Sequence, residues 1–227
     1  MSIMSWNLCH PHIDIELDET DPWSLPIILH TPRDVEITHE DAILAAARGV
    51  ALLLSDERTA PDGEWHEALE GWMFGRIRKV VRRARTQKWQ AIRELPGVDS
   101  VYGNAFVRIL LPHRVSSTPP EVACLQVSGL DLPRHEIPSH GPGEFDLYIA
   151  LNPNVDMSTG KSMAQAGHIA HLATLTQDVT SLGDWMDNGL GTYLAHWNDG
   201  PWAVEVQDAG FTEVIPGTTT AKGDFYR

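Results

Sequence analysis

A strand-like segment that leads into an alanine-rich stretch constrains the fold of this chain more than any other feature. Residues 145–152 (FDLYIALN) alternate as a strand does, and residues 160–176 have the small, apolar composition of a packed helix. A similar order occurs earlier, where residues 25–30 (LPIILH) form a short apolar run and Thr38 can cap a following helix. This alternation predicts an α/β protein whose mixed β-sheet is flanked by helices.

Proline and glycine divide the chain into two parts. Residues 133–144 are rich in both and form the clearest linker in the sequence. We therefore expect an acidic amino-terminal arm at 1–22, a first α/β half at 23–132 and a second half at 145–227. With 227 residues, the chain can bury a substantial core.

Several shorter elements follow from local composition. The run RIRKVVRR at 76–83 is compatible with a strand or a helix, whereas residues 87–95 favour a helix. Short apolar runs predict four further strands, at residues 105–111, 122–127, 202–206 and 212–215.

Composition narrows the cellular context. No apolar run approaches the roughly 20 residues of a membrane helix, and the amino terminus lacks the basic and apolar regions of a signal peptide. The two cysteines, Cys9 and Cys124, are too few for a disulfide framework. We expect a cytoplasmic protein with no membrane partner.

Basic residues cluster in one stretch of an acidic chain. The formal net charge is −14, which by itself argues against a nucleic-acid partner. A local cationic stripe can still bind phosphate, because screening limits distant charges to roughly 8–10 Å. The alternative is a solvated face that acids elsewhere neutralise. The stripe consists of Arg76, Arg78, Lys79, Arg82, Arg83, Arg85, Lys88 and Arg93.

The first chemical motif is GKSMAQAGH at residues 160–168. A lysine in the first turn of a helix adds its charge to the helix dipole, which favours an anion at the carboxyl end of a strand. Gly160-Lys161-Ser162 also matches the end of a P-loop. Position 155 is valine where that motif requires glycine, so a nucleotide triphosphatase is disfavoured.

The second motif is DAGFTEVIPGTTT at residues 208–220. A carboxylate and a hydroxyl held together can orient a water molecule and accept its proton. A turn capped by Asp208 is the alternative reading of this segment taken alone.

Together the two motifs resemble peptidyl-tRNA hydrolases of the archaeal and eukaryotic type, over about residues 145–223. That family carries Gly-Lys-x-x-Ala-Gln-x-x-His at its first helix and Asp-Ala-Gly-x-Thr-x-x-x-Pro-Gly-x-x-Thr near its end. The resemblance implies catalytic roles for Lys161, Asp208, Thr212 and Thr220. The same match suggests His168 as a further catalytic candidate, although a lone helix histidine is more often a core residue. Substrate contacts are expected from Gly160, Gln165, Ala209, Gly210 and Gly217, and from Arg78, Lys79, Arg82, Arg83 and Arg85 of the stripe.

The resemblance implies hydrolysis of the ester between peptide and tRNA, which releases free tRNA without a cofactor. A non-catalytic RNA-binding or scaffold protein that keeps the fold is the alternative. The individual roles of the lysine, the aspartate and the threonines stay open. Metal binding is not expected, because His168 and His171 have metal-like spacing but no third ligand, and Cys9-His10-Pro11-His12 reads as tail composition.

The first half reads as a degenerate copy of the second. Both contain a strand, a turn with proline and a small-residue helix, followed by Trp72-Met73 in one half and Trp185-Met186 in the other. Matching small residues places Ala42 opposite Lys161 and Gly49 opposite His168. The Lys-Val-Val of the family, missing from the second half, occurs at residues 79–81, so the first half would complete the second. Because the family tends to form homodimers, we expect a fused pseudo-dimer or a homodimer; chance similarity of two ordinary units is the alternative.

Overall fold

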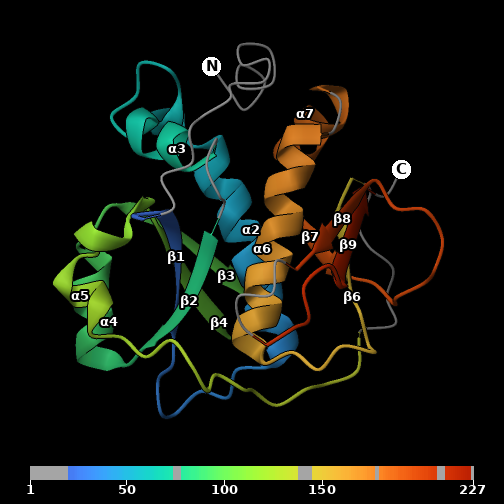
Figure 1. Cartoon of the computed structure of the whole chain (residues 1–227), viewed down its shortest axis with the longest axis horizontal. Coiled ribbons are helices and arrows are strands. Elements are labelled where there is room, and N and C mark those ends of the chain that lie inside the picture. The colour runs from blue at the N-terminus through green and yellow to red at the C-terminus, as the bar shows by residue number, and fades with distance from the viewer. Residues whose placement is uncertain (1–19, 74–77, 138–144, 177–178, 209–212, 226–227) are drawn as a thin grey trace.

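Two mixed β-sheets enclose a central pair of helices (Figure 1). The computed structural model describes residues 20–73, 78–137, 145–176, 179–208 and 213–225. The first sheet has the strand order β2-β1-β4-β3, and a short strand β5 also pairs with β1. Its strands are β1 (Trp23–His30), β2 (Arg78–Ala84), β3 (Gly97–Tyr102), β4 (Ala105–Leu110) and β5 (His113–Arg114).

The second sheet repeats the order and direction of the first. Its order is β7-β6-β9-β8, in which β6 and β7 are parallel and the other neighbours antiparallel, as for β1 and β2 in the first sheet. The predicted α/β fold and the pseudo-dimeric arrangement of two related halves are thus confirmed in their topology. The strands are β6 (Leu147–Leu151), β7 (Thr192–Leu194), β8 (Val204–Gln207) and β9 (Thr219–Phe225).

Helices α2 and α6 pack against each other between the sheets, whereas α4 and α5 lie on the outer side of the first sheet and α3 and α7 lie near one end of the central pair (Figure 1). Thr38 caps α2 as predicted, since its hydroxyl accepts a hydrogen bond from the Asp41 N–H at 3.1 Å. In the described part of the chain, no helix combines the length and apolarity needed to cross a membrane. The helices are α2 (His39–Ser55), α3 (His66–Met73), α4 (Thr86–Arg93), α5 (Pro120–Ala123), α6 (Thr159–Thr176) and α7 (Val179–Asp187), with single 3-10 turns at Glu57–Thr59 and Val115–Ser117.

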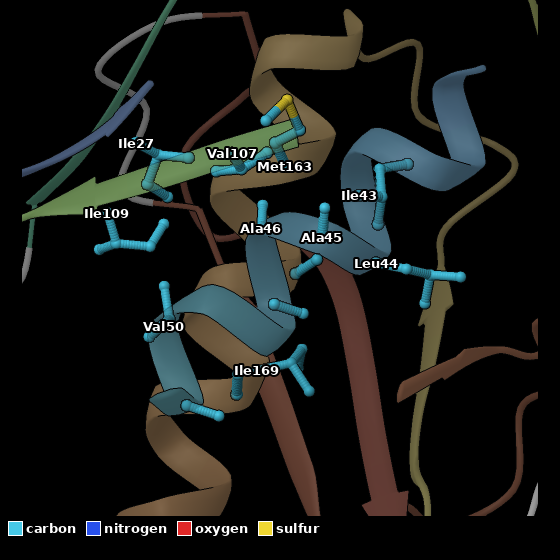
Figure 2. Close-up of a cluster of buried hydrophobic side chains, with 14 of the residues drawn as sticks. Ile27, Ile43, Leu44, Ala45, Ala46, Val50, Val107, Ile109, Met163 and Ile169 are labelled. Atoms are coloured by element: carbon cyan, nitrogen blue, oxygen red, sulfur yellow. The ribbon is translucent and has the colours of Figure 1, made fainter. Parts of the chain in front are cut away.

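One hydrophobic core joins the two halves. Figure 2 shows Ile43 and Val50 of α2 together with Met163 and Ile169 of α6, and all four side chains belong to a single buried cluster. Small residues such as Ala46 allow the two helices to approach closely. Burying each large aliphatic side chain stabilises the fold by roughly 1.5–3 kcal/mol. The halves therefore depend on each other for a large part of their burial.

The helix caps define which residues of the two halves correspond. The Ser158 hydroxyl accepts from the Lys161 N–H at 3.2 Å, as Thr38 accepts from Asp41 in α2. Asp41, rather than the expected Ala42, therefore occupies the position of Lys161. By the same count Gly49 corresponds to Ile169 and not to His168. The sequence-based matching was wrong by one residue, because small residues alone do not fix helix register.

Two strand predictions need correction. The expected strand at 122–127 is instead helix α5 and a turn, because Pro119 and Pro120 begin a short helix that buries Val122 in a second, smaller cluster. The expected strand at 212–215 is not formed by residues 213–215. Strands β3, β5, β7 and β9 were not predicted. The ambiguous basic run forms β2 from Arg78 onward, and its first two residues lie outside the described residues.

Candidate functional site

The amino terminus of α6 is fixed by the strand and the connection that precede it. The capping hydrogen bond from Ser158 starts the helix, and the Gly160 N–H donates to the Leu130 carbonyl at 3.3 Å. The first turn of α6 thereby presents Lys161 toward the end of β8. This is the carboxyl side of β6, where open α/β sheets usually bind ligands.

Lys161, Gln165 and Asp208 converge at this point. The Lys161 Nζ forms an ion pair with Asp208 Oδ2, and the Gln165 Nε2 donates to the same oxygen at 2.8 Å. All three side chains are largely buried. The Gln165 Oε1 is also buried and has no hydrogen-bond partner in the part of the chain that the structure describes. The site therefore combines a paired charge with an acceptor that is open to a ligand donor.

The backbone of Asp208 is held by the turn that follows it. The Asp208 N–H donates to the Thr218 carbonyl at 2.9 Å, and the Gly217 N–H donates to the Asp208 carbonyl at 2.7 Å. Gly217 has φ +81°, a conformation that favours glycine. Its contact with substrate stays a prediction, and its hydrogen bond to the Asp208 carbonyl positions Asp208.

A second carboxylate, from Glu213, lies at the start of α6 and was missed by sequence reasoning. Its two oxygens accept hydrogen bonds from the Ser158 N–H at 2.9 Å and from the Ser158 hydroxyl at 2.8 Å. A negative charge is favourable at a helix amino terminus. The signal was present in the sequence, because Glu213 lies within the second motif.

One of the two predicted threonines, Thr220, lies among the residues that the structure describes. Ala209, Gly210 and Thr212 lie outside the described residues. Thr220 is fully buried, and its hydroxyl donates to the Val206 carbonyl at 3.2 Å, beside an irregularity in the pairing of β8 with β9. Its hydroxyl is therefore engaged by the sheet and not by Asp208.

His168 belongs to a different cluster from Lys161. Its Nδ1 lies 3.2 Å from the Nζ of Lys79, and the Nδ1 of His171 lies 3.4 Å from the same atom. Trp72 completes the group, because its ring stacks on His171 at 4.6 Å and lies 4.7 Å from the Lys79 Nζ. Strand β2 of the first half thus reaches helix α6 of the second.

Burial controls the protonation of this cluster. Desolvation lowers the pKa of Lys79 well below its usual value. Desolvation, followed by the positive charge of Lys79, also lowers the pKa of His168 and of His171. Both imidazoles are therefore neutral at pH 7, and adding protons to the cluster is unfavourable.

Several cations of the predicted stripe hold the connection between the halves. Arg82 donates to the Leu125 carbonyl at 3.1 Å, Arg83 to the Gly129 carbonyl at 3.0 Å, and Lys88 to the Cys124 carbonyl at 2.9 Å. Arg85 is exposed at the position before α4 and makes no capping hydrogen bond with its side chain. Phosphate binding by the stripe stays a prediction, and Arg76 lies outside the described residues.

The arrangement suits chemistry on a polar substrate. Lys161 can neutralise a developing negative charge, and Asp208 can accept a proton. No cluster of three or more histidine, cysteine or acidic side chains suited to a metal occurs within 20–73, 78–137, 145–176, 179–208 and 213–225. The Cys9–His12 segment is outside those ranges. Comparison with known proteins gives no match, whether to family models, to curated proteins or to solved structures.

Proposed function

We propose that the chain hydrolyses the ester bond between peptide and tRNA in peptidyl-tRNA. The observation that carries the proposal is the convergence of Lys161, Gln165 and Asp208 at the amino terminus of α6. These residues come from motifs that lie far apart in the sequence, and both motifs resemble those of one hydrolase family.

The site has the groups that ester hydrolysis needs. Asp208 would accept a proton from water as the water oxygen bonds to the ester carbonyl carbon. Lys161 and the helix dipole would stabilise the negative charge on the carbonyl oxygen. When the carbon–oxygen bond to ribose breaks, the proton would pass to the ribose hydroxyl that leaves. The buried Gln165 Oε1 would accept a hydrogen bond from a hydroxyl of the substrate.

Turnover of labelled peptidyl-tRNA by the full chain tests the proposal. Lys161→Ala and Asp208→Asn should each lower kcat/KM by about 100-fold or more, because each removes a group that acts in the transition state. Asp41→Asn is the matched control, since Asp41 is the counterpart of Lys161 in the first half. It should retain activity within about twofold of the wild type, as expected for a substitution outside the reacting site.

Absence of turnover by the wild-type chain at every salt concentration would contradict the proposal. If the same protein still bound tRNA, the alternative of a non-catalytic RNA-binding protein would replace it.

A further inference from the structure

A cavity of about 610 Å³ lies beside the candidate site, at the carboxyl ends of the parallel strands β6 and β7. Leu151 and Leu194 mark the strand ends on its wall. His39 from the start of α2 and Ser162 from the first turn of α6 face it from the helices. A cavity of this size, at the carboxyl ends of parallel strands, is the usual place for a small ligand in such a fold.

Two polar side chains of this wall, Ser162 and His39, are nearly buried. Ser162 is 1% exposed, and it lies on the cavity wall. His39 is 5% exposed, and its Nδ1 lies 2.9 Å from the Thr159 hydroxyl. Buried hydroxyl and imidazole groups are normally hydrogen-bonded. Both residues line the cavity, so a ligand that fills it can form hydrogen bonds with them.

The charge of the lining disfavours an anion. Burial lowers the pKa of His39 to about 4, so its ring is neutral at pH 7. Within the described part of the chain, Arg134 lines the cavity together with two carboxylates, Glu40 and Asp156. The Arg134 guanidinium is already engaged, because it donates to the Met157 carbonyl at 2.6 Å. A neutral polar ligand suits this lining better than a phosphate or a carboxylate.

An aromatic wall suits a planar ligand. Trp197 lines the cavity, and the Nζ of Lys222 lies 4.8 Å from the centroid of its ring. Lys222 is not among the lining residues, and its contact helps to fix the indole. Ile43 and Leu194 add apolar surface. Flat heteroaromatic rings gain from stacking on such a side chain, whatever their hydrogen-bonding edge.

We infer that this cavity binds a nucleobase or nucleoside, with its ring against Trp197 and its polar edge hydrogen-bonded to Ser162 and His39. Both protein groups can donate or accept, which matches the mixed donors and acceptors of a base edge. The inference does not depend on ester hydrolysis at Lys161.

Titration of the full chain with adenosine, guanosine, cytidine and uridine tests the inference, with tryptophan fluorescence and calorimetry as readouts. At least one nucleoside should bind with a Kd below about 1 mM. Trp197→Leu and Ser162→Ala should each weaken that binding about tenfold, through loss of stacking or of a hydrogen bond. Trp202→Leu is the matched control, because Trp202 lies in the same loop but outside the lining, and its Kd should be unchanged.

The same assay tests whether the cavity disfavours a charged ligand and whether nucleoside binding is independent of Lys161. Adenosine 5′-monophosphate should bind more weakly than adenosine, and Lys161→Ala should leave nucleoside binding intact even if it abolishes hydrolysis. The inference is overturned if no nucleoside binds below about 1 mM. It is also overturned if binding survives both Trp197→Leu and Ser162→Ala, or if the monophosphate is preferred.

Discussion

The two halves share a framework but differ in what they place on it. Trp72 and Trp185 are both fully buried, and each indole donates to a carbonyl six residues later, that of Arg78 at 3.1 Å and that of Gly191 at 2.7 Å. The next residue in each half faces a helix of the other half. In the first half it is Lys79, and in the second it is Thr192, whose hydroxyl lies 3.4 Å from the Leu44 carbonyl. The two halves thus share these scaffold contacts and differ in the chemistry of the residues at equivalent positions.

The largest difference lies where the candidate site is built. In the first half β3 and β4 are joined by a tight turn, and the Asp41 carboxylate accepts from the Asn104 N–H at 3.2 Å. In the second half residues 208–218 form a much longer connection between β8 and β9, and its Asp208 pairs with Lys161. The same helix position meets the same strand connection in both halves. In the first half this contact is a hydrogen bond from the backbone of Asn104 to Asp41. In the second half, where the connection is longer, it is the ion pair of Lys161 with Asp208.

The two halves also pack a glycine against an isoleucine at the same contact between helix and strand, but on opposite elements. A Cβ added at Gly49 on α2 would lie 2.8 Å from Ile109 Cγ1 on β4. A Cβ added at Gly223 on β9 would lie 2.2 Å from Ile169 Cγ2 on α6. Gly49 corresponds to Ile169 by the helix caps. Ile109 corresponds to Gly223 by the sheet register, in which they pair with Ile27 of β1 and Ile149 of β6. Each half therefore places one isoleucine and one glycine at the contact, on exchanged elements.

The largest effect on stability should come from replacing a glycine of this contact by alanine. Gly223→Ala should lower the free energy of unfolding by about 2–3 kcal/mol through overpacking. Gly49→Ala should cost less, because the added helix propensity of alanine offsets about 1 kcal/mol. Chemical denaturation measures both, and a double-mutant cycle should show that Ile169→Ala relieves the Gly223→Ala clash. Equal losses for both alanine variants, or no coupling, would contradict the exchange.

A smaller effect is expected where Lys79 replaces the Thr192 of the other half. Lys79→Met should raise the free energy of unfolding at pH 7 by about 1 kcal/mol or more, because it removes a buried basic group that has no acidic partner in the cluster. Since burial lowers the pKa of Lys79 in the folded state, wild-type stability should fall as the pH drops below the unfolded value of 10.5. The loss of stability should continue until the pH falls below the pKa of Lys79 in the folded state.

The pH profile of unfolding measures this difference. Lys79→Met should abolish the change between about pH 10 and pH 7, whereas the exposed Lys88→Met should preserve it. Below pH 6.5 both variants should lose stability further, because unfolding then exposes His168 and His171, which bind protons more readily in the unfolded chain than when buried. A flat wild-type profile above pH 7 would count against the buried cluster.

The smallest effect concerns nucleic-acid contacts, since β2 is basic whereas its counterpart β7 carries no basic residue. Arg85→Ser should lower the slope of log Kd for tRNA against log salt by about 0.7–0.9, the value for one phosphate contact. Arg83→Ser changes a side chain that holds the connection, so it should also lower the melting temperature. An unchanged slope in both variants would assign the stripe to structure alone.

Much of the fold was accessible from sequence because its signals are local. Strand alternation, the Thr38 cap and the composition of α6 fix β1, β6 and the two central helices. Strand β3 was missed, because GVDSVY is half exposed and becomes a strand only by pairing with β4. Strand β9 was hidden in a threonine- and glycine-rich run whose partners are β6 and β8.

The residues of the candidate site also divide into those that local sequence signals predict and those that depend on distant partners. Lys161, Gln165 and Asp208 could be named because they lie in motifs of fixed spacing. The partners of His168 could not, since Lys79 is 89 positions away and belongs to the other half. The hydrogen bonds from Arg82 and Arg83 to carbonyl groups could not be predicted either, because a charge pattern in the sequence does not indicate which backbone groups a cation will contact.

The placement of both halves in one chain changes the concentration dependence of their shared core. Two separate subunits that bury such a surface part on dilution, and their stability varies with protein concentration. A covalent connection converts that encounter into an intramolecular one with a high effective concentration. The contacts of α2 with α6 therefore persist at any dilution. Each half always meets the same, non-identical neighbour, so a substitution in one half need not suit a second copy of itself.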